Sequence, residues 1–83
     1  MNRHDIYAAI DAEREQQSRQ WNRVHDWGFG DCSSPHVAPT VKCAVLAEEC
    51  GEVSRAVLDN DHESLRAELI QVAAVAVAWL EGI

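Results

Sequence analysis

The 83-residue chain has only three cysteines, and we do not expect disulfide bonds to be the source of its stability. The three cysteines are odd in number, and Cys43 and Cys50 lie about two helical turns apart on what we expect to be one helix. We therefore expect these two residues and Cys32 to be free thiols. A single domain of this size buries only about 60% of the surface of its unfolded chain. We expect the missing stability to come from association with a second copy.

The sequence also lacks segments that would direct it to a membrane. Residues 2–5 lead straight into a mixed, helix-forming sequence, without the basic start, apolar middle and small-residue cleavage site of a signal peptide. The apolar run from Val72 to Leu80 is shorter than the roughly 18 residues that a membrane-spanning helix needs. We expect a cytoplasmic protein with no membrane partner.

Basic residues are few. Lys and Arg total 7 against 14 Asp and Glu, which gives a net charge of −7. This is the wrong sign for a protein that neutralises nucleic-acid phosphates directly, so we expect no direct nucleic-acid partner. An acidic surface can still bind phosphate groups through a metal ion, although many proteins are acidic only because charge keeps them soluble.

Three segments have the apolar spacing of amphipathic helices. The first covers about 5–23, and the second covers about 39–58 with Pro39 in a suitable first-turn position. The third covers about 62–81, after a turn in which Asp61 is a suitable N-cap. The predicted fold class is therefore all-α: one domain of three helices, with an antiparallel helical hairpin that completes a helical bundle by homo-oligomerisation.

The third predicted helix is apolar nearly all round after Glu68. Such a helix needs cover on every side. Two other helices in one small chain cannot supply all of it, so we expect Val72, Val75 and Trp79 to pack against a second copy as well. The pattern leaves a dimer and a tetramer open.

The most informative feature is a set of acidic residues on the second and third predicted helices. Glu49 and Glu52 are three residues apart, so both lie on one helix face. Glu68 and Gln71 have the same spacing. If the chain folds back at Asn60, Glu52 and Glu68 are each eight residues from the turn, and the other two are each eleven. At about 1.5 Å per residue, the pairs meet roughly 12 to 17 Å from the turn.

Carboxylates gathered at one level repel one another and lose solvation, which raises their pKa values unless a cation compensates. Mg²⁺ prefers oxygen ligands and is typically held by a few carboxylates together with substrate phosphates. The spacing therefore predicts a magnesium site for a phosphate ester or anhydride. An ordinary solvated helix face stays open as the alternative, with Glu68 paired to Arg55 or Arg66.

Three nearby residues are less informative. Gly51 lies among the acids of the second helix, where glycine costs up to about 1 kcal/mol relative to alanine. We expect a packing partner or the substrate to approach closely there. Glu13 and Glu63 have no counterpart at a matching height, and we expect both at the surface.

Two short motifs resemble the signature of the all-α nucleotide pyrophosphohydrolases, the superfamily that includes MazG proteins and dimeric dUTPases. They are Leu-Ala-Glu-Glu-Cys-Gly-Glu at 46–52 and Ala-Glu-Leu-Ile-Gln-Val at 67–72. The pattern of that superfamily is Glu-x-x-Glu followed, after a helical return, by Glu-x-x-Asp. Gln71 is a departure, because the family has Asp at that position. The resemblance covers about the last half of the chain.

The resemblance implies Mg²⁺-dependent hydrolysis of a nucleoside triphosphate to the monophosphate and pyrophosphate, in a homodimer or a dimer of dimers, with Mn²⁺ able to substitute. It makes Glu49, Glu52 and Glu68 metal ligands. Gln71 offers only a neutral amide oxygen, so it would bind the metal weakly, through water, or not at all. Glu48 and Glu49 are the candidates for the catalytic base, and Glu48 is also a candidate ligand for a second metal.

Lys42 and Trp21 are candidate substrate-binding residues. Lys42 precedes Glu49 by about two helical turns and can reach a phosphate, although a lone lysine more often faces solvent. Trp21 and Trp27 flank a loop at 28–39 that is rich in Gly, Ser and Pro, a composition and length that suit a binding loop. An aromatic side chain can stack on a base at about 1 to 3 kcal/mol, but a tryptophan can equally belong to the core.

Two other functions stay open. The protein can be a metal-dependent nucleotide binder with little turnover because Gln71 replaces the family Asp. It can also be a structural helical module that oligomerises through its third helix. The sequence does not decide the preferred base or sugar.

Overall fold

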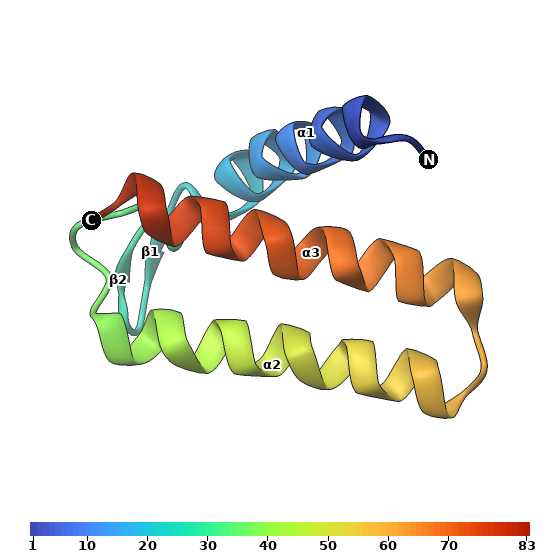
Figure 1. The fold of residues 1–83 in the computed structure, drawn as a ribbon. Helices are drawn as coiled ribbons and strands as arrows, with labels where there is room; N and C mark the ends of the chain where they lie inside the picture. Colours follow the sequence, from blue (N-terminus) through green and yellow to red (C-terminus); the bar gives the residue numbers. More distant parts are fainter.

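The computed structural model describes all 83 residues and contains three long helices (Figure 1). Helix α1 spans Arg3–Trp21, α2 spans Pro39–Leu58 and α3 spans His62–Glu81. Two short strands, β1 (Val24–His25) and β2 (Gly28–Phe29), form an antiparallel hairpin between α1 and α2. The predicted all-helical, three-helix fold is confirmed, while the small hairpin was not predicted.

Helices α2 and α3 begin and end where the sequence predicts. Pro39 lies in the first turn of α2, where its missing N–H removes no helical hydrogen bond. Asp61 caps α3, because its Oδ1 accepts from the backbone N–H of Ser64 at 3.0 Å. Asn60 closes the turn between them with a left-handed φ of 54°, a conformation that asparagine tolerates better than most residues.

Helix α1 differs from the prediction by a small shift toward the N-terminus. It begins at Arg3, because the Asn2 side chain accepts from the backbone N–H of Asp5 at 2.8 Å and acts as the N-cap. It ends at Trp21, where the chain turns into β1. Arg23 therefore lies outside the helix.

Helices α2 and α3 run antiparallel, and α1 packs against α3 but not against α2 (Figure 1). Because α3 contacts both other helices, the fold accounts for part of its apolar sequence. The small core lies where α2, α3 and the loop before α2 meet, and Cys32, Val75 and Ala78 are buried there against Val45 and Leu46.

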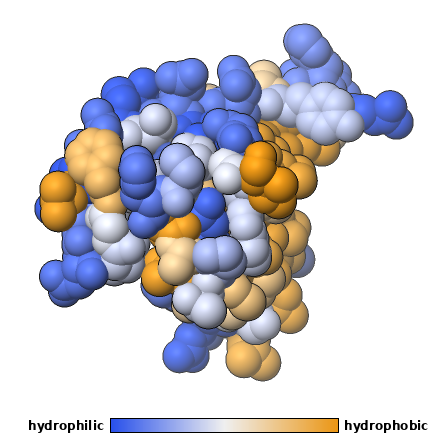
Figure 2. Space-filling view, turned by 90° about the vertical axis from the view of Figure 1, so that its left-hand side faces the viewer, coloured by the Kyte–Doolittle hydropathy of each residue, from blue (hydrophilic) through white to orange (hydrophobic).

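The expected contact of Val75 with a second copy is wrong, since this residue is buried within one chain. Val72 and Trp79 are half-buried. The large apolar side chains that α3 leaves exposed are instead Leu69, Val77 and Leu80. Apolar surface gathers along the right-hand side of the molecule in Figure 2, while polar surface dominates the opposite side. No helix has the length and apolar character needed to cross a bilayer.

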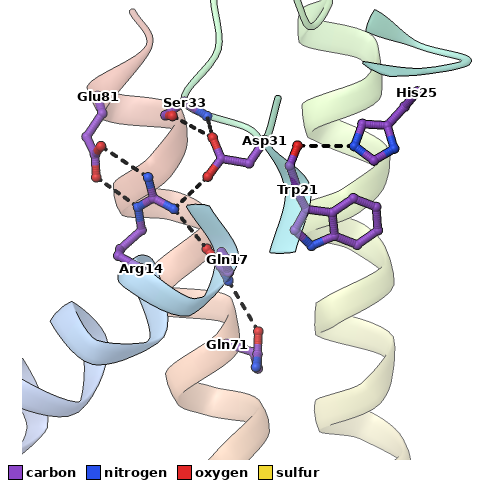
Figure 3. Close-up of polar contacts among 8 residues, drawn as sticks. All are labelled: Arg14, Gln17, Trp21, His25, Asp31, Ser33, Gln71 and Glu81. Atoms are coloured by element: carbon purple, nitrogen blue, oxygen red, sulfur yellow. Dashed lines mark hydrogen bonds and ion pairs between the residues drawn. The ribbon is translucent and has the colours of Figure 1, made fainter. Parts of the chain in front are cut away.

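A polar network joins α1, the loop and the end of α3 (Figure 3). Arg14 is buried, and its Nη1 lies 2.9 Å from Oδ2 of Asp31 while its Nε lies 2.8 Å from Oε1 of Glu81. Although burial opposes it, hydrogen bonds from Ser33 and Arg14 lower the pKa of Asp31. The hydrogen bond from Arg14 lowers the pKa of Glu81. Arg14 thus fixes how α1 lies against the rest of the chain.

Candidate functional site

A pocket of about 770 Å³ lies among the three helices and the loop before α2. One face of α2 forms a wall of it from Thr40 to Glu52, which covers roughly 18 Å at about 1.5 Å per residue. This wall is apolar near the start of α2, at Val41, Ala44 and Val45, and becomes acidic toward the middle of the helix.

Six acidic side chains line the pocket, and no Lys, Arg or His does. The acidic residues are Glu13, Asp31, Glu48, Glu49, Glu52 and Glu68. Asp31 is neutralised by Arg14, but none of the three ion pairs in the chain involves a glutamate of the pocket. The pocket therefore concentrates negative charge that the protein's own cations do not balance.

The electrostatic consequence is clearest at Glu49. This side chain is half-buried, and burial raises the pKa of its carboxyl group. The charges of Glu68, Glu48, Glu52 and Glu13 raise it further. The repulsion that the spacing predicts is therefore present in the fold.

The structure brings most of the predicted site residues together. Glu48, Glu49 and Glu52 line the pocket from α2, and Glu68 and Gln71 line it from α3. The predicted alternative pairing of Glu68 with Arg55 or Arg66 is not seen, because the arginines that form ion pairs are Arg14 and Arg19. Trp21 also lines the pocket and is half-buried.

Lys42, which was predicted to reach a substrate phosphate, does not line the pocket. Lys42 lies on the same face of α2 as Glu49, as the spacing indicates. At Lys42, two turns before Glu49, other parts of the chain cover this face. Lys42 is only 3% exposed, and its Nζ would lie 3.0 Å from a Cβ added to Gly82. Gly82, the C-cap of α3, thus lies against the end of the Lys42 side chain.

The space around Gly51 is open. No atom of the chain lies within 4 Å of the position that a Cβ would occupy there, and the residue is exposed. The close packing partner expected at this glycine is therefore not supplied by the chain itself.

Helix α1 contributes two residues that sequence reasoning missed. Glu13 was expected at the surface, but it is half-buried and lines the pocket with Gln17. The Nε2 of Gln71 donates to Oε1 of Glu13 at 2.7 Å, and the Nε2 of Gln17 donates to Oε1 of Gln71 at 3.2 Å. The spacing of Glu13, Gln17 and Trp21 by four residues was the available signal, because it puts all three on one face of α1.

An aromatic wall stands near the start of α2. The rings of His25 and Trp27 stack with centroids 4.7 Å apart and an interplanar angle of 3°. Trp21 lies 6.0 Å from Trp27 in a tilted arrangement, and both tryptophans line the pocket. The hairpin is held at this end because Gly28 lies against the backbone of His36, just before α2 begins.

The donor chemistry of the pocket fits a hard divalent cation. Its charged groups are all carboxylates, which are the ligands that Mg²⁺ and Mn²⁺ prefer. The raised pKa of Glu49 reflects burial and, in addition, repulsion by neighbouring carboxylates that a cation would relieve. No group of three or more His, Cys, Asp or Glu side chains is arranged as a ready metal site. The glutamate side chains must therefore rotate toward one another to hold an ion.

Comparison of the chain with protein families, with curated proteins and with solved structures returned no match.

Proposed function

We propose that this protein is a magnesium-dependent nucleoside triphosphate pyrophosphohydrolase of the MazG-like, all-α type. The observation that supports it best is the pocket itself, in which glutamates from three helices gather without a basic side chain beside an aromatic wall. A site with this charge can accept a triphosphate only if cations accompany it. Hydrolysis of a phosphate anhydride is the chemistry that such a site suits best.

The proposed ligands are Glu49, Glu52 and Glu68, while Gln71 occupies the fourth position of the motif with a neutral amide. When bound, Mg²⁺ would offset the charge of the triphosphate and polarise the attacking water. Glu48 lines the pocket from an exposed position on α2, and it is the candidate base that accepts a proton from that water. Glu49 is the second candidate, because it lines the pocket from the same turn of α2.

The reaction consumes one water and needs no other reactant. The water oxygen bonds to the α-phosphorus, and the bond from this phosphorus to the oxygen that bridges the α- and β-phosphates breaks. Pyrophosphate leaves with the electron pair of that bond, and the proton of the water passes to the carboxylate base. The products are a nucleoside monophosphate and pyrophosphate.

The two ends of the pocket suit the two ends of a nucleotide. The triphosphate would lie at the acidic end with its cation, and the base would stack at the aromatic end on Trp21 or Trp27. The wall of α2, roughly 18 Å long, separates the two ends. This arrangement favours a nucleotide over a small phosphate compound without an aromatic ring.

We propose in addition that the protein is a cytoplasmic homodimer or dimer of dimers. Only 10 of the 83 residues are buried in one chain, and a further apolar surface stays exposed on α3. Leu69, Val77 and Leu80 are spaced by eight and three residues, so they lie on one face of that helix. A second copy that covers this face would supply the burial that the single chain lacks.

The proposal is tested by incubating the purified protein with Mg²⁺ and a panel of canonical and modified nucleoside triphosphates. Pyrophosphate release from at least one of them is expected, and the variants Glu49→Gln, Glu52→Gln and Glu68→Gln should lose it. Glu63→Gln is the matched control, because Glu63 is exposed on α3 and does not line the pocket. No release by the wild-type protein, with its helical circular dichroism intact, would contradict the proposal.

A second function is favoured by one observation, namely that the amide oxygen of Gln71 already accepts a hydrogen bond from Gln17. If this oxygen is needed by the metal, the protein is a nucleotide binder with little turnover. This alternative predicts nucleotide affinity without products, and a gain in rate in the variant Gln71→Asp.

A further inference from the structure

The amide of Gln71 is engaged on both sides, and the order of donors and acceptors determines its orientation. Arg14 has only donors, and its Nη1 lies 3.3 Å from Oε1 of Gln17. The Nε2 of Gln17 then donates to Gln71, whose own Nε2 donates to Glu13. Because the ionised carboxylate of Glu13 has only acceptors, neither amide can be turned round without losing a bond at each end. Figure 3 shows the first three members of this chain of hydrogen bonds.

This series of hydrogen bonds starts at Arg14, a residue whose own position is fixed by ion pairs. Arg14 is held by Asp31 and Glu81, and both Arg14 and Gln17 are buried. Of the three hydrogen bonds that link Arg14, Gln17, Gln71 and Glu13, the bond between Gln71 and Glu13 is the shortest at 2.7 Å, as expected when the acceptor is charged. The carboxylate of Glu13 is therefore oriented by buried neighbours and is not an ordinary side chain on the surface of α1.

Glu13 lies beside Gln71, the residue at which the superfamily pattern that the motif resembles has an acid. Gln71 stands at the fourth position of the acidic motif, and Glu13 lies within hydrogen-bond distance of its amide. Both line the pocket with Glu49 and Glu68. The Oε2 of Glu13 makes no hydrogen bond within the chain and is free to bind a cation.

We infer that Glu13 supplies the fourth carboxylate of the cation site from α1, and that Gln71 is a positioning residue that holds this carboxylate in place. The inference rests on the proposed function, because it names a ligand for the same site. A neutral residue at 71 is then a consequence of the geometry, since an acid there would face the Glu13 carboxylate at hydrogen-bond distance.

The test uses the full chain and Mn²⁺ alone, with the free ion measured by electron paramagnetic resonance. The variant Glu13→Gln keeps the size and an acceptor oxygen but removes the charge. It is expected to weaken Mn²⁺ binding at least about tenfold, because even the loss of a group that only supports a ligand typically costs 10 to 100-fold. Glu15→Gln is the matched control, since Glu15 lies on the exposed face of the same helix.

A swapped variant separates charge from packing. Glu13→Gln combined with Gln71→Glu exchanges the two side chains atom for atom and keeps a donor facing an acceptor. It should recover most of the Mn²⁺ affinity lost in Glu13→Gln. Gln71→Asp should bind Mn²⁺ no better than the wild type, because it removes the donor to Glu13 and adds a like charge beside it.

These measurements separate the role of Glu13 from the proposed function of the pocket. If the wild type binds Mn²⁺ and Glu13→Gln binds it equally well, the role of Glu13 is refuted while the proposed function stands. A tighter site in Gln71→Asp would also refute it. If the folded wild type binds no Mn²⁺, with or without a nucleoside triphosphate, the proposed function falls and this inference falls with it.

Discussion

Replacing Arg14 with leucine should destabilise this small domain more than any other single change of a charged residue. Leucine keeps much of the apolar volume of the arginine stem but removes the partner of Asp31 and Glu81. Both side chains of the Arg14 and Asp31 pair are only 10% exposed, so Asp31 would be left charged and buried. Removing one partner of a buried pair typically costs about 3 to 5 kcal/mol.

The second ion pair of Arg14, with Glu81, adds little to this loss of stability. The Glu81 side chain is 48% exposed, and water can solvate it when Arg14 is gone. Exposed pairs contribute about 0 to 1 kcal/mol. At roughly 0.05 to 0.15 kcal/mol per residue, a chain of 83 residues has a total stability of about 4 to 12 kcal/mol. Arg14→Leu should therefore remove a large part of it, with a fall in Tm of at least about 12 °C.

Thermal and urea unfolding followed by circular dichroism measure this effect, at one protein concentration because self-association would shift the Tm. Arg19→Leu is the matched control on the same helix, since Arg19 and Glu15 are 3.9 Å apart with side chains 67% and 69% exposed. It should change the free energy of unfolding by less than about 0.5 kcal/mol. A loss in Arg14→Leu as small as in this control would refute the view that Arg14 anchors α1.

The fold, the proposed self-association and the proposed nucleotide site lead to one further prediction each. Asp31 and Glu81 have lowered pKa values in the folded chain, so their stabilising effect is present above about pH 4 and is lost as pH falls through the folded values. An acid titration of Arg14→Leu should show a smaller loss, because the contacts of Arg14 with both carboxyl groups are gone while the hydrogen bonds from Ser33 to Asp31 remain. Leu80→Lys should convert an oligomer into a monomer in sedimentation experiments, whereas Val24→Lys on the exposed hairpin should not. Trp27→Ala should weaken nucleotide binding by about 1 to 3 kcal/mol in calorimetry, while the same change at Phe29, which does not line the pocket, should have no effect.

The parts of the fold that could be predicted from the sequence depend on local signals. Pro39 and the Asp61 cap act within one turn of their own helix, so the bounds of α2 and α3 are readable from composition and spacing. The matching heights of Glu49 and Gln71, and of Glu52 and Glu68, could be predicted for a related reason. When a short turn closes at Asn60, the depth of each residue along the hairpin equals its distance from the turn in the sequence.

The rest depends on contacts between distant residues. Arg14 bonds to Asp31 and Glu81, which lie 17 and 67 residues away in the sequence. No local sequence pattern indicates such distant pairs. The two-residue strands are too short for a detectable alternation of apolar and polar residues. Glu13 escaped notice because its entry into the pocket requires the angle between α1 and α3, and that angle is set by the buried polar network.

Glu49 should show opposite effects on stability with and without a divalent cation. Its pKa is raised in the folded chain by burial and by Glu68, Glu48, Glu52 and Glu13. A carboxyl group with a raised folded pKa destabilises the fold once pH exceeds its unfolded value, because the folded state holds the proton more tightly. Glu49→Gln should therefore raise the Tm of the metal-free protein at neutral pH.

A cation that binds only the folded state raises the Tm of the wild type, and the variant should lose this gain because it lacks a ligand. Melting curves of both proteins with EDTA and with Mn²⁺ measure the two effects. A variant that is less stable than the wild type in EDTA would show that the crowded carboxylate does not strain the fold, and the physical case for a cation in this pocket would fail.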